Sequence, residues 1–397
     1  MQILKEPTEH GEQAILKLIR IKGPISRKEI AQSLDVSLPT VSNKVGELLS
    51  LGIVREIASG GSGKGRKPSL LEYNRDSGYV IGVDIGGEYI RTALSNMVGE
   101  IVSKTEVPAL TYRGMDSIID RVAQTIDEVT EQAGVDAARI LSMGVGLPGI
   151  LGDRSEKTFL SPFLDPATAS RLVNLLRSRY NVPIRIENDV DMAVIGEKWK
   201  GAAKGHRDIV YVNLGLGLAC GIIINGELYR GAHGAAGEIG FMVLDKMHVQ
   251  GTHTTRGALE QRIAGEGVVA NLLERLEKKG IDANIIFPGE RDAEAVFAQA
   301  VNGNQEAQAV LEETLTYFAM ALVNVIAVLN PEIVVIGGGM GIALGDSLDE
   351  IRSIAERHIP RMARMVPSAL GAMAGVYGAL AVALRTGRSS IGYLISS

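Results

Sequence analysis

The 397-residue sequence has little cysteine, few aromatic residues and no long apolar run. Its single cysteine, Cys220, excludes an intramolecular disulfide framework and a cysteine-rich zinc site, and it favours a reducing compartment. The chain does not open on a basic segment followed by an apolar one, and no uninterrupted apolar run is long enough to cross a bilayer. We therefore expect a cytoplasmic protein that has no membrane partner.

The composition is that of folded globular domains. Hydrophobic residues make up 46% of the chain, and its length predicts two or three domains. The net charge of −5 is unevenly distributed, because residues 1–78 carry 12 Lys and Arg against 9 Asp and Glu. That excess of +3 leaves −8 for the rest of the chain, so the N-terminal part is the natural partner of a polyanion.

Residues 24–57 predict a helix, a turn, a second helix and a strand. Ser26, followed three residues later by Glu29, forms a capping box that opens the first helix. Pro39 suits the first turn of the second helix, which has one apolar stripe and ends at Gly52. Its opposite face carries short polar groups near the N-terminal end, which helix-turn-helix proteins place in the major groove. The residues that we expect to contact operator DNA are Ser37, Thr40, Ser42, Asn43 and Lys44.

A glycine-rich basic loop at residues 59–68 follows, between strand-like runs at residues 53–57 and 69–73. It resembles the wing of a winged helix, and its cations are Lys64, Arg66 and Lys67. On a glycine-rich backbone such cations can follow a phosphate path or enter a narrow minor groove. The alternative for this loop is a mobile linker with solvated charges. We assign residues 1–75 to a winged helix-turn-helix DNA-binding domain.

From residue 76 onward, short β-rich runs alternate with glycine turns and amphipathic helices, which is typical of α/β domains. Residues 79–94 predict two strands around a glycine turn, and residues 210–226 repeat this plan about 130 residues later. Residues 333–339 predict a buried strand that runs into a third glycine turn. The repetition indicates an internally duplicated fold with a cleft between two lobes. Glycines at such strand ends let backbone N–H groups approach a nucleotide closely.

Several short motifs in this region resemble those of the ROK family (repressor, open reading frame, kinase). Besides the glycine turns they are Gly-Val-Gly-Leu-Pro-Gly at 144–149, Glu-Asn-Asp at 187–189 and Gly-Glu-Ile-Gly at 237–240. The resemblance covers nearly the whole chain and implies an actin-like, ribonuclease H-like ATPase fold, that of two-lobed sugar kinases. We place its lobes at residues 76–190 and 191–397, and leave open whether the C-terminal helix packs back on the first lobe. The N-terminal winged helix is typical of the family's repressor branch, which includes xylose and N-acetylglucosamine repressors, whereas kinase members generally lack it.

The resemblance also implies a sugar site. In the family's kinases, the pair matching Asn188 and Asp189 holds sugar hydroxyls, and the aspartate is the general base on the attacking hydroxyl. The glutamates matching Glu238 and Glu260 hold the sugar as well, and we add Gly149 to this set. Carboxylates and amides at loop ends supply the fixed donors and acceptors that a polyol requires. The structural alternatives are loop capping by the Asn-Asp pair and surface solvation of the two glutamates.

The nucleotide loops depart from the kinase pattern. Glu88 stands where similar kinases have threonine, and a carboxylate about 4 Å from a phosphate charge costs roughly 4 kcal/mol at an effective dielectric near 20. Leu216 replaces a hydroxyl residue, and Ala219 and Cys220 replace glycines. The remnants of these loops are Asp84, Gly86, Gly87, Gly215, Gly217, Gly338 and Gly339. We therefore expect neither ATP nor Mg²⁺ as a cofactor and regard Asp189 as a vestigial base.

Many ROK proteins also carry a closed tetrahedral zinc site made by one histidine and three cysteines. In this chain the four ligand positions are occupied by Phe241, Gly251, His253 and Ala258. One histidine cannot make that site, and the neighbouring His233 and His248 lack thiolate partners at a useful spacing. We expect no structural zinc and no other metal.

The sequence therefore predicts a sugar-responsive DNA-binding transcriptional regulator of carbohydrate genes, in the first instance a repressor. A small carbohydrate effector would release it from its operator or retain it there. Paired half-sites require a homodimer or a higher homo-oligomer, to which the apolar helix predicted at residues 312–329 can lend surface besides its role as a core helix. One alternative is an ATP-dependent sugar kinase with an appended DNA-binding head. Another is a body that serves only for dimerisation or for docking another protein.

Overall fold

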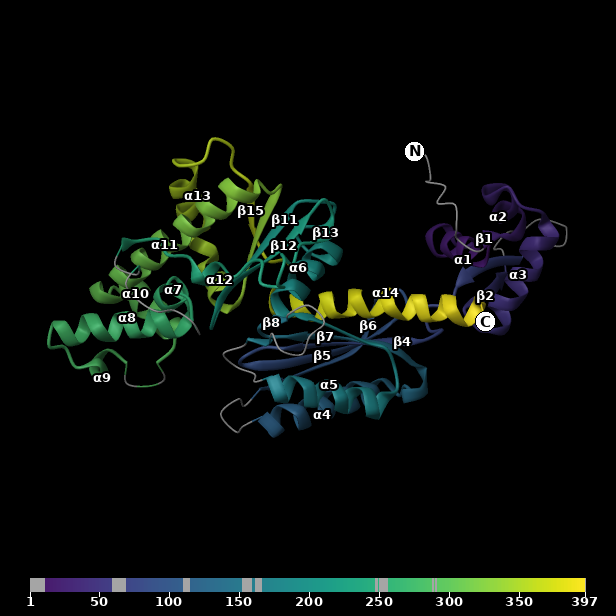
Figure 1. Ribbon diagram of the computed structural model, residues 1–397, viewed down its shortest axis with the longest axis horizontal. Coiled ribbons are helices and arrows are strands. Elements are labelled where there is room, and N and C mark those ends of the chain that lie inside the picture. The colour runs from purple at the N-terminus through teal and green to yellow at the C-terminus, as the bar shows by residue number, and fades with distance from the viewer. Residues whose placement is uncertain are drawn as a thin grey trace.

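The structure is a computed structural model that describes residues 11–58, 69–109, 115–151, 159–160, 166–246, 249, 256–287, 289 and 291–396. A small helical head lies at one end of an elongated molecule, and the body consists of two lobes (Figure 1). Each lobe contains one five-stranded sheet. The predicted order of a winged helix followed by two α/β lobes is therefore confirmed.

The head contains three helices and a sheet with the strand order β1-β3-β2. Its elements are α1 (Gly11–Lys22), β1 (Ile25–Ser26), α2 (Arg27–Leu34), α3 (Leu38–Ser50), β2 (Val54–Ala58) and β3 (Ser69–Tyr73). The predicted capping box is present, since Ser26 Oγ accepts from the Glu29 N–H at 3.3 Å and Glu29 Oε2 accepts from the Ser26 N–H at 2.9 Å. Ser37 caps α3, Pro39 lies in its first turn, and Gly52 follows its end with a φ of +68°. The predicted helices, turn and strands of the head are thus confirmed.

The head is packed against the body by buried apolar side chains. One hydrophobic cluster joins Leu71 and Tyr73 of the head to Met97 in the first lobe and to Leu380 in the C-terminal helix α14 (Ala374–Ser396). All four side chains are at most 8% exposed. Because apolar surface withdrawn from water stabilises the arrangement that buries it, this cluster fixes the orientation of the head on the body.

The first lobe is built on a sheet with the strand order β10-β7-β4-β5-β6. Its strands are β4 (Tyr79–Ile85), β5 (Tyr89–Asn96), β6 (Ile101–Pro108), β7 (Ile140–Leu147) and β10 (Ile184–Asn188). Strands β4 and β5 are antiparallel around the predicted glycine turn, and β4, β7 and β10 are parallel. A two-stranded ribbon of β8 (Ile150–Leu151) and β9 (Phe159–Leu160) follows β7. Helices α4 (Met115–Ala133) and α5 (Pro166–Tyr180) cover one face of the sheet.

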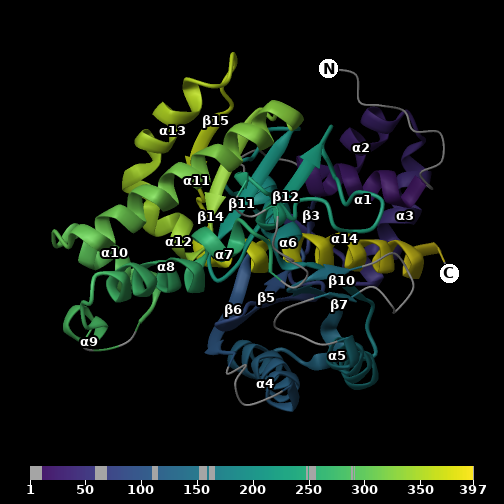
Figure 2. The same cartoon turned by 60° about the vertical axis from the view of Figure 1, so that its left-hand side comes forward.

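Helix α14 crosses the opposite face of this sheet, beside α6 (Asp189–Lys200), as Figure 1 and Figure 2 show. Two glycines permit this close approach. A Cβ on Gly144 of β7 would lie 2.1 Å from the carbonyl oxygen of Ala379, and one on Gly82 of β4 would lie 2.8 Å from Leu380. The C-terminal helix is therefore seated on the first lobe.

The second lobe has a sheet with the strand order β13-β12-β11-β14-β15, in which β11 and β12 are antiparallel and β11 and β14 parallel. Its strands are β11 (Ile209–Leu214), β12 (Leu218–Ile224), β13 (Glu227–Leu228), β14 (Ile333–Gly337) and β15 (Arg364–Pro367). Its helices are α7 (Glu260–Ile263), α8 (Gly265–Lys278), α9 (Ala283–Ile286), α10 (Ala293–Val301), α11 (Gln305–Leu329), α12 (Gly339–Ala343) and α13 (Leu348–Glu356). The lobe boundary that we expect between residues 190 and 191 falls within the first turn of α6, which contacts both sheets.

Among the described helices, only α11 is long and apolar enough to cross a bilayer. Half of its most apolar stretch is buried. Phe318 and Leu322 of α11 are fully buried in the core of the second lobe. A buried core helix, as the sequence predicts for this region, accounts for its apolar character.

Candidate functional site

A cavity of about 410 Å³ lies between the two lobes. All twelve residues that the sequence assigns to the sugar site or to the nucleotide loops line it. They are Asp84, Gly86, Gly87, Gly149, Asn188, Asp189, Gly215, Gly217, Glu238, Glu260, Gly338 and Gly339. The glycine turns meet there because β4, β11 and β14 all end at the cavity. Their roles in binding a ligand stay predictions.

Asn188 connects the cavity to the start of helix α6. Its Oδ1 accepts hydrogen bonds from the backbone N–H groups of Val190 at 2.8 Å and Asp191 at 3.0 Å. Its Nδ2 donates to the carbonyl oxygen of Gly149 at 2.9 Å. The capping role that we weighed as the alternative to sugar binding is therefore present. An amide nitrogen carries two hydrogens, so Asn188 can still donate the second one to a ligand hydroxyl.

Several carboxyl groups that line the cavity have raised pKa values. Asp84, at the end of β4, is 8% exposed, and burial raises its pKa to about 6. Burial, reinforced by the charge of Asp84, raises the pKa of Asp189 to about 8. Burial and the nearby charge of Glu260 raise the pKa of Glu238 to about 7. Near neutral pH the cavity therefore offers both protonated carboxyl donors and carboxylate acceptors, which suits the hydroxyl groups of a polyol.

Glu260 lies at the start of α7 and is held over the second glycine turn. Its Oε2 accepts a hydrogen bond from the backbone N–H of Leu218 at 3.1 Å. A Cβ on Gly217 would lie 3.2 Å from the same oxygen, so the turn passes directly beneath it. Burial raises the pKa of Glu260 as well. Since Glu238 and Glu260 are half-buried in a cavity wall, surface solvation does not describe them.

The charge around the cavity is predominantly negative. Among its described lining residues, Arg91 is the only lysine or arginine, and it forms an ion pair of 2.5 Å with Glu106. Glu88 and Leu216, the two departures from the kinase pattern, line the cavity together with the glycine turns. A carboxylate and an apolar side chain thus stand beside the turns where the resemblance places phosphate groups.

One ion pair beside this cavity was not predicted from the sequence. Arg230, which follows β13 in the second lobe, donates to both carboxylate oxygens of Glu187 on β10, at 2.6 and 3.0 Å. The pair therefore joins the two lobes next to Asn188. On α6, burial and the charge of Glu187 raise the pKa of Asp191 to about 7. Glu187 was visible only as the first residue of the 187–189 motif, and no sequence signal marked Arg230.

The described residues contain no group of three or more His, Cys, Asp or Glu side chains arranged to hold a metal ion. Of the four positions that match the zinc ligands, Phe241 is exposed and Ala258 is buried. The other two, Gly251 and His253, lie outside the described residues, as does His248. His233 is described and exposed.

Only some of the polar side chains on α3 are available to contact DNA. Ser37 and Thr40 are exposed, but their hydroxyl groups bond to each other at 2.7 Å. Asn43 is exposed, whereas Ser42 is half-buried. Lys44 turns toward α1 and donates to Glu12, so its ammonium group joins two helices of the head.

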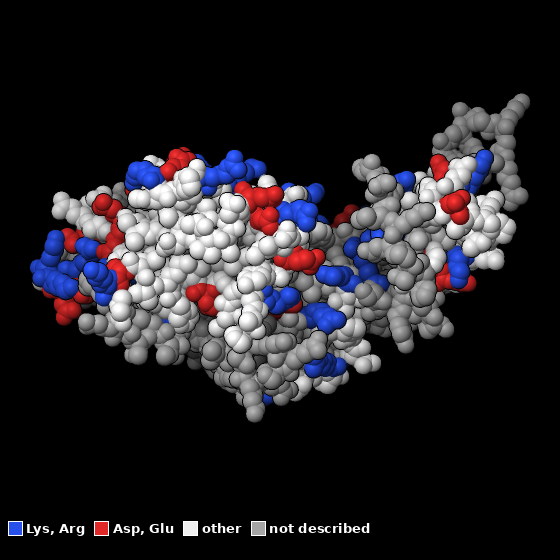
Figure 3. Space-filling model, turned by 45° about the horizontal axis from the view of Figure 1, so that its top comes forward, with Lys and Arg blue, Asp and Glu red and all other residues white. Residues whose placement is uncertain are grey.

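The three wing cations Lys64, Arg66 and Lys67 lie outside the described residues. Elsewhere on the surface, Figure 3 shows Lys and Arg side chains gathered on the part of the body that adjoins the head. On α3, Asn43 is an exposed residue that we expect to contact DNA and that lies within the described part of the chain.

Comparison with known proteins now identifies the family. The model of the ROK family matches residues 80–386, and a model of winged helix-turn-helix DNA-binding domains matches residues 12–55. The chain belongs to the ROK family. It is similar to the putative xylose repressor of Caldicellulosiruptor sp. strain Rt8B.4, with 32% identity over 344 residues and 86% of each chain covered. The xylose repressor of Bacillus subtilis strain 168 is 27% identical over 378 residues, which cover 93% of each chain. A glucokinase of Thermotoga maritima is 31% identical over 266 residues, 66% of this chain and 82% of the glucokinase.

Solved structures of ROK proteins have the same fold. A ROK family transcriptional regulator that is a homologue of the E. coli MLC protein superposes with a TM-score of 0.75 at 21% identity, covering 98% of this chain and 99% of that one. A ROK glucokinase from Streptomyces griseus, in complex with glucose and AMPPNP, gives a TM-score of 0.63 at 26% identity, covering 78% of this chain and 100% of the glucokinase. The repressors cover more of the chain than the glucokinases. The predicted family, fold and class of function are therefore confirmed: this is a ROK transcriptional regulator with a winged helix-turn-helix DNA-binding domain.

Proposed function

We propose that this ROK protein is a repressor whose operator binding responds to a small neutral sugar held in the cavity between the lobes. The observation that carries the proposal is the convergence of Asn188, Asp189, Glu238 and Glu260 on one cavity in a chain that also has a DNA-binding head. D-xylose is the first effector to test, because relatives at 27% and 32% identity are named xylose repressors.

The charge of the cavity favours a neutral sugar over a sugar phosphate. Two like charges about 4 Å apart repel by roughly 4 kcal/mol at an effective dielectric near 20, on the order of a thousandfold in affinity. Glu88 and those of the other carboxyl groups that are ionised impose such repulsion on a phosphate, and the single described lysine or arginine of the lining is already paired with Glu106. Hydroxyl groups meet no such penalty.

A sugar kinase is the second candidate, because glucokinases are among the relatives and Asp189 lines the cavity where a general base would act. Against it, Glu88 and Leu216 lie beside the glycine turns where a kinase would hold the phosphates. Catalysis of phosphoryl transfer depends on positioning the phosphates and neutralising their charge, which these two residues do not favour. We therefore propose no ATP, Mg²⁺ or zinc cofactor. An ATP-dependent assay with xylose and glucose separates the two functions, since turnover of about 1 to 1,000 per second would make the protein a kinase.

The proposal is tested by a thermal-shift titration with D-xylose, D-glucose and their phosphate esters. A sugar at 100 times its dissociation constant stabilises the folded state by about 2.7 kcal/mol, which is readily detected. We expect a neutral sugar to raise Tm for the wild type and not for Glu238→Gln. The matched control is Glu274→Gln on the exposed surface of α8, which should respond as the wild type does. If no neutral sugar shifts Tm, or if the Glu238 variant responds fully, the site is wrong.

We also propose that the regulator is a cytoplasmic homodimer or higher homo-oligomer. The reason is geometric, since repressors with a helix-turn-helix commonly read two half-sites with two related heads. Sedimentation at several protein concentrations, with and without a palindromic DNA fragment, tests this. A monomer under all conditions would contradict it.

A further inference from the structure

Helix α6 runs from the cavity to the junction between the body and the head. At its N-terminal end, Asn188 and Asp189 line the cavity. At its C-terminal end, Trp199 and Lys200 contact the turn between β5 and β6. Its 12 residues span about 18 Å at 1.5 Å per residue. Because α6 is packed against α14 and both sheets, it moves as one piece when it moves.

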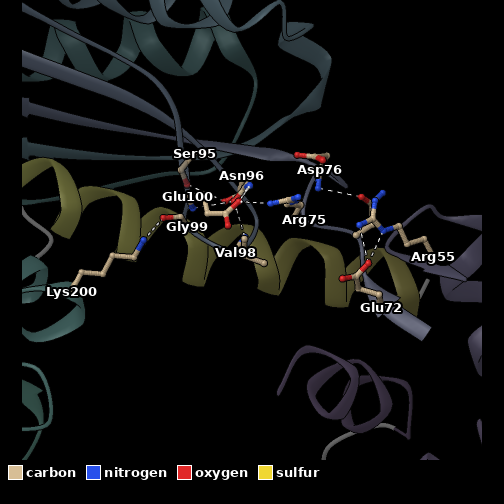
Figure 4. A network of polar contacts seen from close by, with 11 residues as sticks. Arg55, Glu72, Arg75, Asp76, Ser95, Asn96, Val98, Gly99, Glu100 and Lys200 are labelled. Atoms are coloured by element: carbon tan, nitrogen blue, oxygen red, sulfur yellow. Dashed lines mark hydrogen bonds and ion pairs between the residues drawn. The ribbon is translucent and has the colours of Figure 1, made fainter. Parts of the chain in front are cut away.

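The C-terminal end of α6 fits closely onto the β5–β6 turn. Lys200 Nζ donates to the carbonyl oxygen of Gly99, as Figure 4 shows. The ring of Trp199 lies so near that a Cβ on Gly99 would be 2.5 Å from it, and the φ of Gly99 is +83°. The ammonium group of Lys200 lies 4.6 Å from the centroid of the same ring. These contacts are close-packed. A shift of α6 along its axis must therefore displace the β5–β6 turn.

The β5–β6 turn is itself bound to Arg75, in the segment that leads to the head. Asn96 Oδ1 accepts from the backbone N–H of Glu100 at 3.0 Å, and Asn96 Nδ2 donates to Glu100 Oε2 at 2.8 Å. The same carboxylate oxygen accepts from Arg75 Nη1 at 3.0 Å (Figure 4). The backbone N–H of Met97 donates to the carbonyl oxygen of Arg75 at 2.9 Å. Side chain and backbone thus fasten residue 75 to the turn.

The last contacts reach the candidate DNA-reading helix. The backbone N–H of Asn74 donates to the carbonyl oxygen of Ile53 at 2.9 Å, and its side-chain amide donates to that of Gly52 at 2.7 Å. Gly52 follows the end of α3. An unbroken set of contacts therefore extends from the cavity through α6, the β5–β6 turn and residues 74–75 to α3.

We propose that α6 and the turn at residues 96–100 transmit the state of the cavity to the winged helix, with Arg75 and Lys200 as positioning residues. The inference rests on the proposed function, because a sugar that bonds to Asn188 would alter the hydrogen bonds at the first turn of α6. Shifts of 1–2 Å in packed helices are a common form of switching. Linkage requires the effect to be reciprocal, so DNA at the head would also change the cavity.

The test measures hydrogen–deuterium exchange on the full chain without any sugar. Asn188→Ala removes the N-cap of α6, and we expect about fivefold faster exchange in its first turn, the equivalent of ~1 kcal/mol for a lost cap. Backbone amides of β2 and of residues 74–78 should also change their exchange rates. With Arg75→Met or Lys200→Met added, the first turn of α6 should respond as before. The response of the head should be reduced by either change and reduced most when both are present.

A matched control is Arg179→Met, which breaks an exposed ion pair to Asp127 between α5 and α4 of the same lobe, away from this route. Added to Asn188→Ala, it should leave the response of the head intact. If the methionine variants acted only by lowering overall stability, this control would reduce the response as well. If Asn188→Ala does not fold, the milder Asn188→Ser, which removes the bond to the carbonyl oxygen of Gly149, replaces it as the perturbation. An unresponsive head in the wild-type background, or a response unchanged by the two methionine substitutions together, overturns the inference. Because no sugar is used, either result is independent of the thermal-shift test of the proposed function.

Discussion

Replacing Asp189 by asparagine should stabilise the protein at neutral pH and flatten the pH dependence of its stability. Burial and the charge of Asp84 raise the pKa of Asp189 from its ordinary 3.8 to about 8. The folded state therefore keeps a proton on this group at pH values where the unfolded chain has lost it. Between about pH 4 and pH 8 the free energy of unfolding must then fall as the pH rises, because the folded state binds more protons.

The structure sets the size of the effect. One pKa unit corresponds to 1.36 kcal/mol. Because pH 7 lies about three units above the ordinary pKa of an aspartate, the penalty at pH 7 is at most about 4 kcal/mol. An asparagine has the shape of the protonated acid and does not ionise, so it removes this penalty. The gain should be largest at pH 8 and should vanish near pH 4.

Urea unfolding of both proteins at pH 5, 6, 7 and 8 measures the difference directly. The matched control is Asp349→Asn, because Asp349 is 89% exposed on α13 and should leave the curve unchanged. Residual slope is expected in the Asp189 variant, since Asp191 and Glu238 also have raised pKa values of about 7. Parallel stability curves for wild type and Asp189→Asn would refute the reasoning, because they would mean that this carboxyl ionises equally in both states.

Three further predictions concern the DNA-binding head and the phosphate turns. Asn43→Ala should change the preference among operator variants by about 1–3 kcal/mol in a binding titration and should alter non-specific affinity much less. Arg66→Ala and Lys67→Ala should weaken binding to all sequences and reduce the slope of log K against log salt by about one each, because each phosphate contact releases counterions. Glu88→Thr combined with Leu216→Thr should lower the dissociation constant for AMPPNP, by up to about a thousandfold, in isothermal titration calorimetry. Unchanged salt slopes, unchanged base preference or unchanged nucleotide affinity would contradict the respective assignments.

The head could be predicted from the sequence because its signals are local. The capping box of Ser26 and Glu29 and the proline in the first turn of α3 fix where two helices begin, and neither depends on distant residues. The orientation of the head could not be predicted in this way. It depends on Tyr73, Met97 and Leu380 meeting in one cluster, and residues so far apart in the sequence give no periodic signal.

The same distinction applies to the candidate site. The glycine turns and the Asn-Asp pair were recognisable as motifs, and a duplicated fold brings the ends of β4, β11 and β14 together at the cavity. Capping by Asn188 was considered only as an alternative to sugar binding, and the bond of Lys44 to Glu12 was not predicted. A residue on the polar face of a helix is predicted to be free, but a neighbouring helix can supply a partner that only the tertiary structure reveals.

Magnitudes decide how the cavity and the head can be coupled. A typical allosteric coupling is worth 1–3 kcal/mol, and exposed ion pairs in water contribute little. The Arg75 and Glu100 side chains are both more than half exposed, so their pair cannot carry such a coupling by itself. The contact of the half-buried Trp199 ring with the buried Gly99 and the backbone bond from Met97 must carry most of it. A single substitution at residue 75 or 200 should therefore weaken the response without abolishing it, and the two together should remove more than the sum of their separate effects.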